Sequence, residues 1–459
     1  MTQPVLKIEK YSYAYPGSRD AVLKDIQLVI NAGECLCITG PTGSGKSTLL
    51  LAIKDLLPDG RLSGEILSRK TGQLRGSDIG IVLQNPETQL LANTIGSEIA
   101  FGLENRCVSP DRMESRIRGA VSAVGLDFPL DFPVLKLSMG QKYRLIVASI
   151  LAMSPRILLL DEPGAQLDPP GIQKLKHVIS DLKNQGVAVV ICEHHPGYFS
   201  DIIDIHRVLA EDGTLRPAAD TPEIQPMAEH SPPKARELQG NPESLLKAVN
   251  LCVTENESLP IWSSANFTIE KGRRVGVYGD NGTGKTTLLR CMTGNITPAK
   301  GTISVFGKAP SPKWLRHKIG CLFQNPQKQI FENTVFDEIA FPLKRMGFSR
   351  SQAEGEVNRL LRFMEMEHLG SHSPHKLSFG QKHLVVLASA LVHHPSLLIL
   401  DDPFAGLDFR RRKTVQDLLM SVSEEKNMTL IWTGHHLDGL QKHADRVLEV
   451  SGGGIASRE

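Results

Sequence analysis

The chain has 459 residues, of which 41% are hydrophobic and 22% charged, and its formal net charge is +2. This composition is that of an ordinary globular protein, and the small net charge provides no large basic field for nucleic acid. No apolar run reaches the roughly 20 residues that cross a bilayer, and the opening MTQPVLKIEK lacks a signal-peptide pattern. We therefore expect a cytosolic protein that meets a membrane only through a partner.

The first elements alternate between strands and helices. Apolar and polar residues alternate from Leu6 to Tyr15, which predicts a strand. A second predicted strand, Glu34 to Gly40, leads into GPTGSGKS, and a helix is expected from Lys46 onward. The later segments RILLLDE and VAVVICEHH are apolar and rich in branched residues, as buried parallel strands are. The sequence therefore predicts an α/β fold with a mostly parallel sheet flanked by helices.

The composition changes in the middle of the chain. Residues 217–244 contain six prolines and have no apolar periodicity, which predicts an extended linker. The segment LLKAVNLCVTE then restarts the first strand pattern near Leu245. We therefore expect one domain over residues 1–216, a linker over 217–244 and a second domain over 245–459.

The second domain repeats the motifs of the first at an offset of about 240 residues. GPTGSGKS recurs as GDNGTGKT, LSMGQ as LSFGQ, and ILLLDEP as LLILDDP. A single GxxxxGK[ST] match occurs by chance in unrelated proteins. Two matches, each followed by the same motifs in the same order, indicate a duplicated P-loop domain.

The glycine-rich loops predict a polyphosphate site in each domain. Glycines let backbone N–H groups point inward around the phosphates, and the following helix adds its positive end. The loop lysine reaches the β- and γ-phosphates, and the next hydroxyl holds Mg²⁺. We expect ATP to contact Gly40, Pro41, Thr42, Gly43, Ser44, Gly45, Lys46, Ser47 and Thr48, and Gly279, Asp280, Asn281, Gly282, Thr283, Gly284, Lys285, Thr286 and Thr287.

Two acidic residues follow a predicted buried strand in each domain: Asp161-Glu162 and Asp401-Asp402. We expect the first acid of each pair to support Mg²⁺ and the second to polarise the attacking water. The alternative, a helix-capping acid, accounts for a single acid but not for a pair after four apolar residues in both domains. The expected metal ligands are Ser47, Gln84, Asp161, Thr286, Gln324 and Asp401.

Matching glutamines and histidines complete the predicted sites. Gln84 and Gln324 occur in VLQNP and LFQNP, and we expect both to contact the nucleotide and its metal. His194 and His435 follow the last apolar strands. A histidine at a strand end is usually structural, but its matching place in both repeats favours contact with the γ-phosphate. The expected catalytic residues are Glu162, His194, Asp402 and His435.

Together these motifs resemble the ATP-binding cassette of ABC proteins, over nearly the whole chain apart from the linker. The resemblance implies an antiparallel β subdomain and a helical signature subdomain in each cassette. It also implies an intramolecular cassette dimer, in which each ATP lies between a phosphate loop and the other cassette's signature. Met139 and Phe379 replace a signature glycine, but the phosphate-facing serine and second glycine remain. The expected signature contacts are Ser378, Gly380 and Gln381 over Lys46, and Ser138, Gly140 and Gln141 over Lys285.

The two expected ATP sites are unequal. Asp402 stands where the family has glutamate, and aspartate is one methylene shorter. A misplacement near 1 Å can cost about 10²-fold in rate. Tyr15 fits the adenine-stacking position of the first cassette, whereas the aligned residue of the second is Glu255. We therefore expect slow hydrolysis at the second site.

The residues after each glutamine narrow the resemblance. QNPETQ and QNPQKQ are each followed by Asn-Thr and then EIAF, which resembles the energising ATPases of energy-coupling-factor (ECF) transporters. These import vitamins or nickel and cobalt, and their two cassettes grip a transmembrane T subunit that contacts a substrate-binding S subunit. The implied location is the cytoplasmic face of the membrane. Glu98 and Glu338 are candidates to pair with arginines of the T subunit, the alternative being a solvated helix face.

Three other functions remain open. A soluble twin-cassette factor acting on ribosomes or nucleic acid shares the duplication, but such proteins join their cassettes by a charged helical arm and not by a proline-rich linker. A sugar importer shares the membrane partner but not the paired QNPxxQ and EIAF blocks. A degenerate, regulatory ATPase conflicts with the presence of Lys46, Asp161, Glu162 and His194.

Overall fold

The computed structural model describes residues 4–18, 20–41, 43–72, 74–165, 167–194, 196–218, 243–255, 259–405, 407, 409–434, 437–451 and 454–458. The chain divides into two compact units, Met1–Ile224 and Gln225–Glu459. Thr42, His435 and most of the predicted linker lie outside the described residues.

A six-stranded sheet forms the centre of unit 1. Its strands in spatial order are β5 (Ile79–Val82), β6 (Ile157–Asp161), β7 (Ala188–Cys192), β3 (Cys35–Thr39), β8 (Ile205–Leu209) and β9 (Leu215–Pro217). Neighbouring strands from β5 to β8 run parallel, and β9 pairs antiparallel to β8. Every residue of β3, β6 and β7 is buried, which confirms the buried strands predicted from their apolar sequences.

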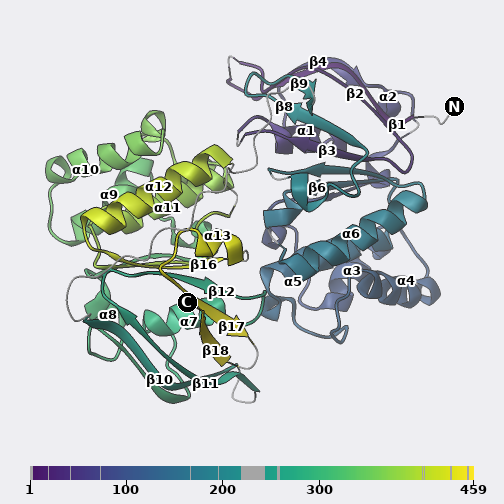
Figure 1. The fold of residues 1–459 in the computed structure, drawn as a ribbon. Coiled ribbons are helices and arrows are strands. Elements are labelled where there is room, and N and C mark those ends of the chain that lie inside the picture. Colours follow the sequence, from purple (N-terminus) through teal and green to yellow (C-terminus); the bar gives the residue numbers. More distant parts are fainter. Residues whose placement is uncertain are drawn as a thin grey trace. The chain divides into compact units, whose positions relative to one another are not determined.

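A second sheet and several helices surround this centre. The antiparallel strands are β2 (Leu23–Asn31), β1 (Pro4–Ala14) and β4 (Arg61–Ile66). Figure 1 shows α3, α4 and α5 gathered at the end of the unit opposite this antiparallel sheet. The helices are α1 (Lys46–Lys54), α2 (Leu67–Lys70), α3 (Ile95–Glu104), α4 (Pro110–Ala123), α5 (Met139–Ala152) and α6 (Pro169–Asn184), with short 3-10 turns η1 (Gly76–Asp78), η2 (Pro86–Thr88), η3 (Val134–Lys136), η4 (Pro163–Ala165) and η5 (Pro196–Tyr198).

Unit 2 repeats this architecture. Its central sheet has the order β14 (Ile319–Leu322), β15 (Leu397–Leu400), β16 (Thr429–Gly434), β12 (Arg274–Tyr278), β17 (Arg446–Ser451) and β18 (Gly454–Arg458). The antiparallel sheet has the order β11 (Leu259–Glu270), β10 (Ser244–Glu255) and β13 (Lys300–Val305). The helices are α7 (Lys285–Met292), α8 (Pro312–Leu315), α9 (Val335–Arg345), α10 (Arg350–Phe363), α11 (Phe379–Leu391), α12 (Phe409–Glu425) and α13 (Leu437–Gln441), with turns η7 (Pro326–Gln329), η8 (Glu367–Leu369) and η9 (Pro374–Lys376).

The two units therefore have the predicted fold class, an α/β P-loop cassette with an antiparallel sheet and a helical region. In each unit the phosphate loop joins an interior strand of the parallel sheet to the first long helix, β3 to α1 and β12 to α7. This edge, outside the carboxyl ends of parallel strands, is where open α/β sheets bind ligands. Within the described residues, no helix combines the length and apolar character needed to cross a membrane.

Candidate nucleotide-binding sites

The phosphate loop of unit 1 has the backbone that its glycines predict. Gly43 and Gly45 have φ values of 89° and 101°. A Cβ atom on Gly45 would lie 2.9 Å from Cγ1 of Val22, so both the conformation and the space require glycine. The ammonium group of Lys46 donates to the carbonyl oxygens of Gly40 at 2.8 Å and Pro41 at 3.1 Å. The lysine is thereby held inside the loop at the start of α1.

The loop of unit 2 matches these contacts. Gly284 has a φ of 98°, and Lys285 donates to the carbonyl oxygens of Gly279 at 2.6 Å and Asp280 at 2.8 Å. Unit 2 has one further contact, made by a tryptophan that has no tryptophan counterpart in unit 1. The indole N–H of the buried Trp262 donates to the carbonyl oxygen of Thr283 at 3.0 Å. Trp262 therefore lies directly against the second phosphate loop.

The first acid of each pair contacts the hydroxyl that follows the loop lysine. Ser47 donates to Oδ2 of Asp161 at 2.7 Å, and Thr286 donates to Oδ2 of Asp401 at 2.6 Å. Burial, with the neighbouring Glu162 charge second, raises the pKa of Asp161 to about 7. Its Oδ1 atom is buried and accepts no hydrogen bond from the described residues. A buried carboxylate with an unused oxygen beside a hydroxyl fits a divalent cation held by oxygen ligands.

The second acid of each pair has an unusual backbone. Glu162 and Asp402 have φ values of 49° and 54°, in the left-handed region that non-glycine residues rarely adopt. Such a conformation costs about 1–3 kcal/mol and persists where neighbouring contacts impose it. In unit 1 the N–H of Glu162 donates to the carbonyl oxygen of Cys192 at 2.9 Å. The chain thus turns sharply at the end of β6, and the Glu162 side chain leaves the direction of the strand.

Gln84 and His194 meet the carboxylate of Glu162. The amide nitrogen of Gln84 donates to Oε2 at 2.6 Å, and Nε2 of His194 lies 2.8 Å from Oε1. The other ring nitrogen of His194 lies 3.1 Å from the carbonyl oxygen of Gly40. Sequence residues 40, 84, 162 and 194 are therefore brought together in unit 1, which places an acid, a histidine and an amide beside the phosphate loop.

The corresponding region of unit 2 is arranged differently. The hydroxyl of Thr433 accepts from the N–H of Asp402 at 2.7 Å and donates to Oδ1 of Asp401 at 2.8 Å. Both carboxylate oxygens of Asp401 therefore accept hydroxyl hydrogen bonds, from Thr286 and Thr433. Gln324, the counterpart of Gln84, is partly buried. Thr433 replaces Cys192 of unit 1 and ties the two acids together.

Tyr15 lies beside the first phosphate loop. Its hydroxyl is 3.1 Å from Oγ1 of Thr48, and its ring packs edge-on against Tyr13 with centroids 5.1 Å apart. This position is compatible with the predicted base-stacking role. The side chain of Glu255, the aligned residue of unit 2, lies outside the described side chains.

The signature serines begin the helices that follow them. Ser138 caps α5 by accepting from the N–H of Gln141, and the Gln141 side chain accepts from the N–H of Ser138. Ser378 and Gln381 form the same capping box at α11. This reciprocal cap fixes the serine at the positive end of a helix. Gly140 and Gly380 are buried in the first turns.

The alternative interpretation of Glu98 and Glu338, a solvated helix face, is wrong, and their pairing with arginines of a T subunit remains a prediction. Both are buried, with 5% and 2% of the residue exposed. Oε2 of Glu98 accepts from the N–H groups of Leu91 and Ala92, and Oε2 of Glu338 accepts from those of Phe331 and Glu332. Each carboxylate therefore accepts two backbone hydrogen bonds, through one of its oxygens, from the loop after the glutamine.

Sequence reasoning missed a buried acid in unit 1. Oε1 of Glu193 accepts from the N–H of Gly164, and Oε2 accepts from the N–H of His194 at 3.1 Å. Glu193 is only 3% exposed. Its two hydrogen bonds link the chain after Glu162 to His194. An acid at the end of the apolar segment VAVVIC was the available signal. Its counterpart in unit 2 is Gly434.

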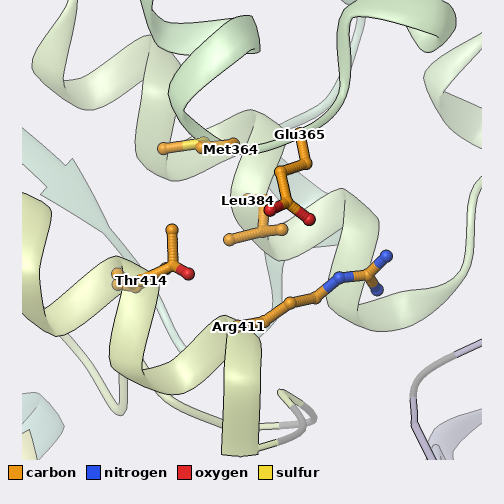
Figure 2. Close-up of a pocket in the computed structure, with 6 residues that line it drawn as sticks. Met364, Glu365, Leu384, Arg411 and Thr414 are labelled. Carbon is orange, nitrogen blue, oxygen red and sulfur yellow. The ribbon is translucent and has the colours of Figure 1, made fainter.

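A pocket in unit 2 lies apart from these residues. Figure 2 shows Met364, Glu365, Leu384, Arg411 and Thr414 around it, from the turn after α10 and from α11 and α12. Its cavity volume is about 10 Å³, which barely accommodates one water molecule. None of these residues belongs to the predicted nucleotide sites.

Comparison with known proteins agrees with this geometry. The family model described as ABC transporter matches residues 23–165 and 262–405. A Methanosarcina acetivorans protein named "Putative ABC transporter ATP-binding protein" is 30% identical, with 99% of this chain and 85% of the relative covered. The Bacillus subtilis "Putative HMP/thiamine import ATP-binding protein YkoD" is 28% identical, with 98% and 91% covered.

Among solved structures, a chain in a model of ribosome-bound archaeal Pelota and ABCE1 superposes with a TM-score of 0.70. It is 20% identical and covers 97% of this chain and 78% of its own length. At that identity the likeness concerns the twin-cassette fold alone. The match of the family model to both units, together with the paired phosphate loops and acids, shows that this chain belongs to the ABC transporter ATP-binding family, whose cassettes bind ATP and couple its hydrolysis to transport.

Proposed function

We propose that this chain is the ATP-hydrolysing subunit of an ECF-type importer for a vitamin or a transition-metal ion, bound at the cytoplasmic face of the membrane to a T subunit and, through it, to an S subunit. The observation that carries the proposal is a pair of loops, residues 90–92 and 330–332, that present an apolar side chain to solvent in each unit. The relative named for HMP/thiamine import supports a vitamin as one class of cargo.

Each loop carries an exposed hydrophobic residue whose backbone N–H donates to a buried glutamate. Leu91 is 68% exposed and Phe331 is 56% exposed, although the backbone of both residues is bonded to a buried glutamate. The Phe331 ring also packs edge-on against Phe341, with centroids 4.5 Å apart. Burying a carboxylate costs free energy unless it is fully hydrogen-bonded. A protein that uses two such carboxylates to rigidify exposed apolar loops has surfaces suited to a partner.

The loops also connect the proposed docking surface to the ATP sites. Leu91 and Phe331 follow Gln84 and Gln324 closely in sequence, and Gln84 contacts Glu162. A movement of the glutamine loop therefore reaches the apolar side chain through a short, hydrogen-bonded segment. This gives a physical path from hydrolysis to a membrane partner, as a transport ATPase requires.

We propose that the two cassettes are residues 1–216 and 245–459. The chain binds two ATP molecules. Lys46 and Lys285 bind the phosphates, and each ATP is closed over by the signature serine of the opposite cassette. The oxygens of Ser47, Gln84 and Asp161, and of Thr286, Gln324 and Asp401, would hold Mg²⁺, which neutralises charge on the phosphates. Glu162 orients and deprotonates the attacking water, and His194 contacts the γ-phosphate.

The second site is proposed to hydrolyse ATP slowly. Asp402 is shorter than Glu162, and its N–H is held by Thr433. Because Thr433 also bonds to Asp401, the two acids of unit 2 form one hydrogen-bonded group beside the loop. This arrangement suits nucleotide retention better than activation of water.

The test is co-purification from detergent-solubilised native membranes with ATP present. Leu91→Glu and Phe331→Glu place a charge on each proposed docking loop, and Leu56→Glu, at a residue 55% exposed elsewhere in unit 1, is the matched control. We expect the unmodified chain and the control to recover a small polytopic membrane protein. The double variant should recover at least about tenfold less, which corresponds to 1.4 kcal/mol of binding free energy.

ATPase activity of the purified variants separates docking from damage. Both variants should hydrolyse ATP at the rate of the unmodified chain, because neither residue belongs to a nucleotide site. Recovery of ribosomal or nucleic-acid partners without a membrane protein would contradict the importer proposal. If the double variant and the control recovered equal amounts of the membrane protein, the proposal that these loops dock onto it would be contradicted.

A further inference from the structure

An ion pair in unit 1 joins the glutamine loop to the signature helix. The ammonium group of Lys142 lies 2.7 Å from Oε1 of Glu87. Lys142 is 8% exposed, and the side chain of Glu87 is 25% exposed. The contact is therefore largely shielded from solvent, so its geometry matters more than that of a surface ion pair.

Each end of this pair is fixed close to a nucleotide-binding residue. Glu87 belongs to η2, whose cap is Asn85, the neighbour of Gln84. Lys142 lies in the first turn of α5, where its N–H donates to the carbonyl oxygen of Ser138 at 2.8 Å. Gln84 contacts the carboxylate of Glu162, and Ser138 is the signature serine. The pair thus spans from the water-activating acid of unit 1 to the signature of unit 1.

Unit 2 has the same elements without the ion pair. Gln327 replaces Glu87 in η7, and Lys382 replaces Lys142 in the first turn of α11. Lys382 forms no ion pair with the described residues, and burial lowers its pKa. Gln327 is exposed, and its N–H donates to the side chain of Asn325 at 3.0 Å. The lysine is common to both units, whereas its carboxylate partner is present in one.

We propose that Glu87 and Lys142 are positioning residues that make the glutamine loop and signature helix of unit 1 move together, so that the nucleotide state beside Glu162 controls how Ser138 closes over the phosphate loop of unit 2. The proposal rests on the two-site function proposed above. We call the Glu87–Lys142 ion pair the strut. Because unit 2 lacks the carboxylate, the coupling is directional: the site of unit 1 acts on the site of unit 2 through the strut, and no equivalent ion pair among the described residues carries the effect from unit 2 to unit 1.

Steady-state ATPase of the purified full-length chain tests the strut. Glu87→Gln and Lys142→Met each remove it, and we expect each to lower kcat about tenfold and the Hill coefficient for ATP towards one. The double variant should be no slower than either single variant, because both remove the same interaction. The reversed pair, Glu87→Lys with Lys142→Glu, should restore most of both values.

A matched control moves the carboxylate to the other unit. Gln327→Glu gives Lys382 an acidic neighbour, and when combined with Glu87→Gln it should leave kcat and the Hill coefficient as low as in Glu87→Gln alone. Rescue by this transfer would overturn the directional part of the proposal. Unchanged kcat and Hill coefficient in folded Glu87→Gln and Lys142→Met would overturn the strut altogether.

Two further readouts separate coupling from folding and from the proposed function. A purely structural pair would lower the unfolding midpoint by circular dichroism and leave the Hill coefficient unchanged, which overturns the proposal. All three tryptophans, Trp262, Trp314 and Trp432, lie in unit 2. ATP titration of their fluorescence therefore reports the second site. A native chain that binds ATP by this signal but never hydrolyses it would overturn the proposed ATPase function and the strut with it.

Discussion

The two proposed nucleotide sites of this chain share the contacts of their phosphate loops and differ around the second acid of each pair. The loop lysines bond to the same two carbonyl positions, and the hydroxyls of Ser47 and Thr286 donate to equivalent aspartates. Around the second acid the units diverge. Glu162 contacts Gln84 and His194, whereas Asp402 is held from behind by Thr433. The comparison teaches that one fold can keep the contacts of its phosphate loop while those around the second acid change.

The divergence extends to residues behind each site. Glu193 bonds to the backbone of Gly164 and His194 in unit 1, and glycine occupies its place in unit 2. Tyr143 of α5 is replaced by His383 of α11, and both are fully buried. These differences lie near the second acid of each pair. We therefore expect substitutions of these residues to change the rate of ATP hydrolysis mainly when they are made in unit 1.

The largest expected effect comes from the second acids. Glu162→Gln should lower kcat about 10³-fold, because the carboxylate proposed to activate water becomes a neutral amide. Asp402→Asn should change kcat by less than about threefold, because the site of unit 2 is proposed to contribute little to turnover. Steady-state ATPase of both variants, with ATP binding confirmed by tryptophan fluorescence, measures the difference. Equal losses in the two variants would show that the sites are equivalent.

A smaller effect is expected at Glu193. Glu193→Gln keeps the volume of the side chain but turns one hydrogen-bond acceptor towards the N–H groups of Gly164 or His194 into a donor. The displaced histidine should lower kcat about tenfold, while KM for ATP changes little, since the phosphate loop is intact. The unfolding midpoint should stay near that of the native chain. A rise in KM without a fall in kcat would assign Glu193 to binding.

The smallest effect concerns pH and the stability of unit 2. Burial lowers the pKa of His383 from 6.5 to about 4, against the opposing charge of Asp402. The unfolded chain therefore takes up this proton first, and unit 2 loses stability as pH falls from 6.5 to 4, by roughly 3 kcal/mol at most. His383→Phe should remove this part of the pH dependence, measured by urea unfolding followed by tryptophan fluorescence. If the free energy of unfolding of His383→Phe fell between pH 7 and pH 5 by as much as that of the native chain, the assignment of this pH dependence to His383 would be contradicted.

Much of the site follows from the sequence because its determinants are local. The glycines of GPTGSGKS dictate the loop backbone, and the buried strands β3, β6 and β7 follow from apolar runs. The same holds for the capping box at Ser138, which is set by Gln141 in the adjoining turn. Each of these features depends on residues close in the chain, where spacing alone fixes geometry.

The remaining features depend on tertiary placement. The acids Glu98 and Glu338 look solvent-facing on a helix, yet the preceding loop folds over them and donates two backbone hydrogen bonds to each. The Glu87–Lys142 pair joins residues from separate elements, and neither residue type is diagnostic by itself. Thr433 acquires its role because β16 ends beside β15. No pattern in the sequence specifies these approaches.

The central claim is that unit 1 hydrolyses ATP and unit 2 holds it. The most direct measurement is vanadate trapping with a photoreactive, radiolabelled ATP analogue, followed by cleavage at a protease site inserted between residues 219 and 242. The inequality of the sites predicts that trapped label is found on the fragment carrying Lys46 and depends on Glu162. Label trapped equally on both fragments, and lost equally with Glu162→Gln and Asp402→Asn, would contradict it.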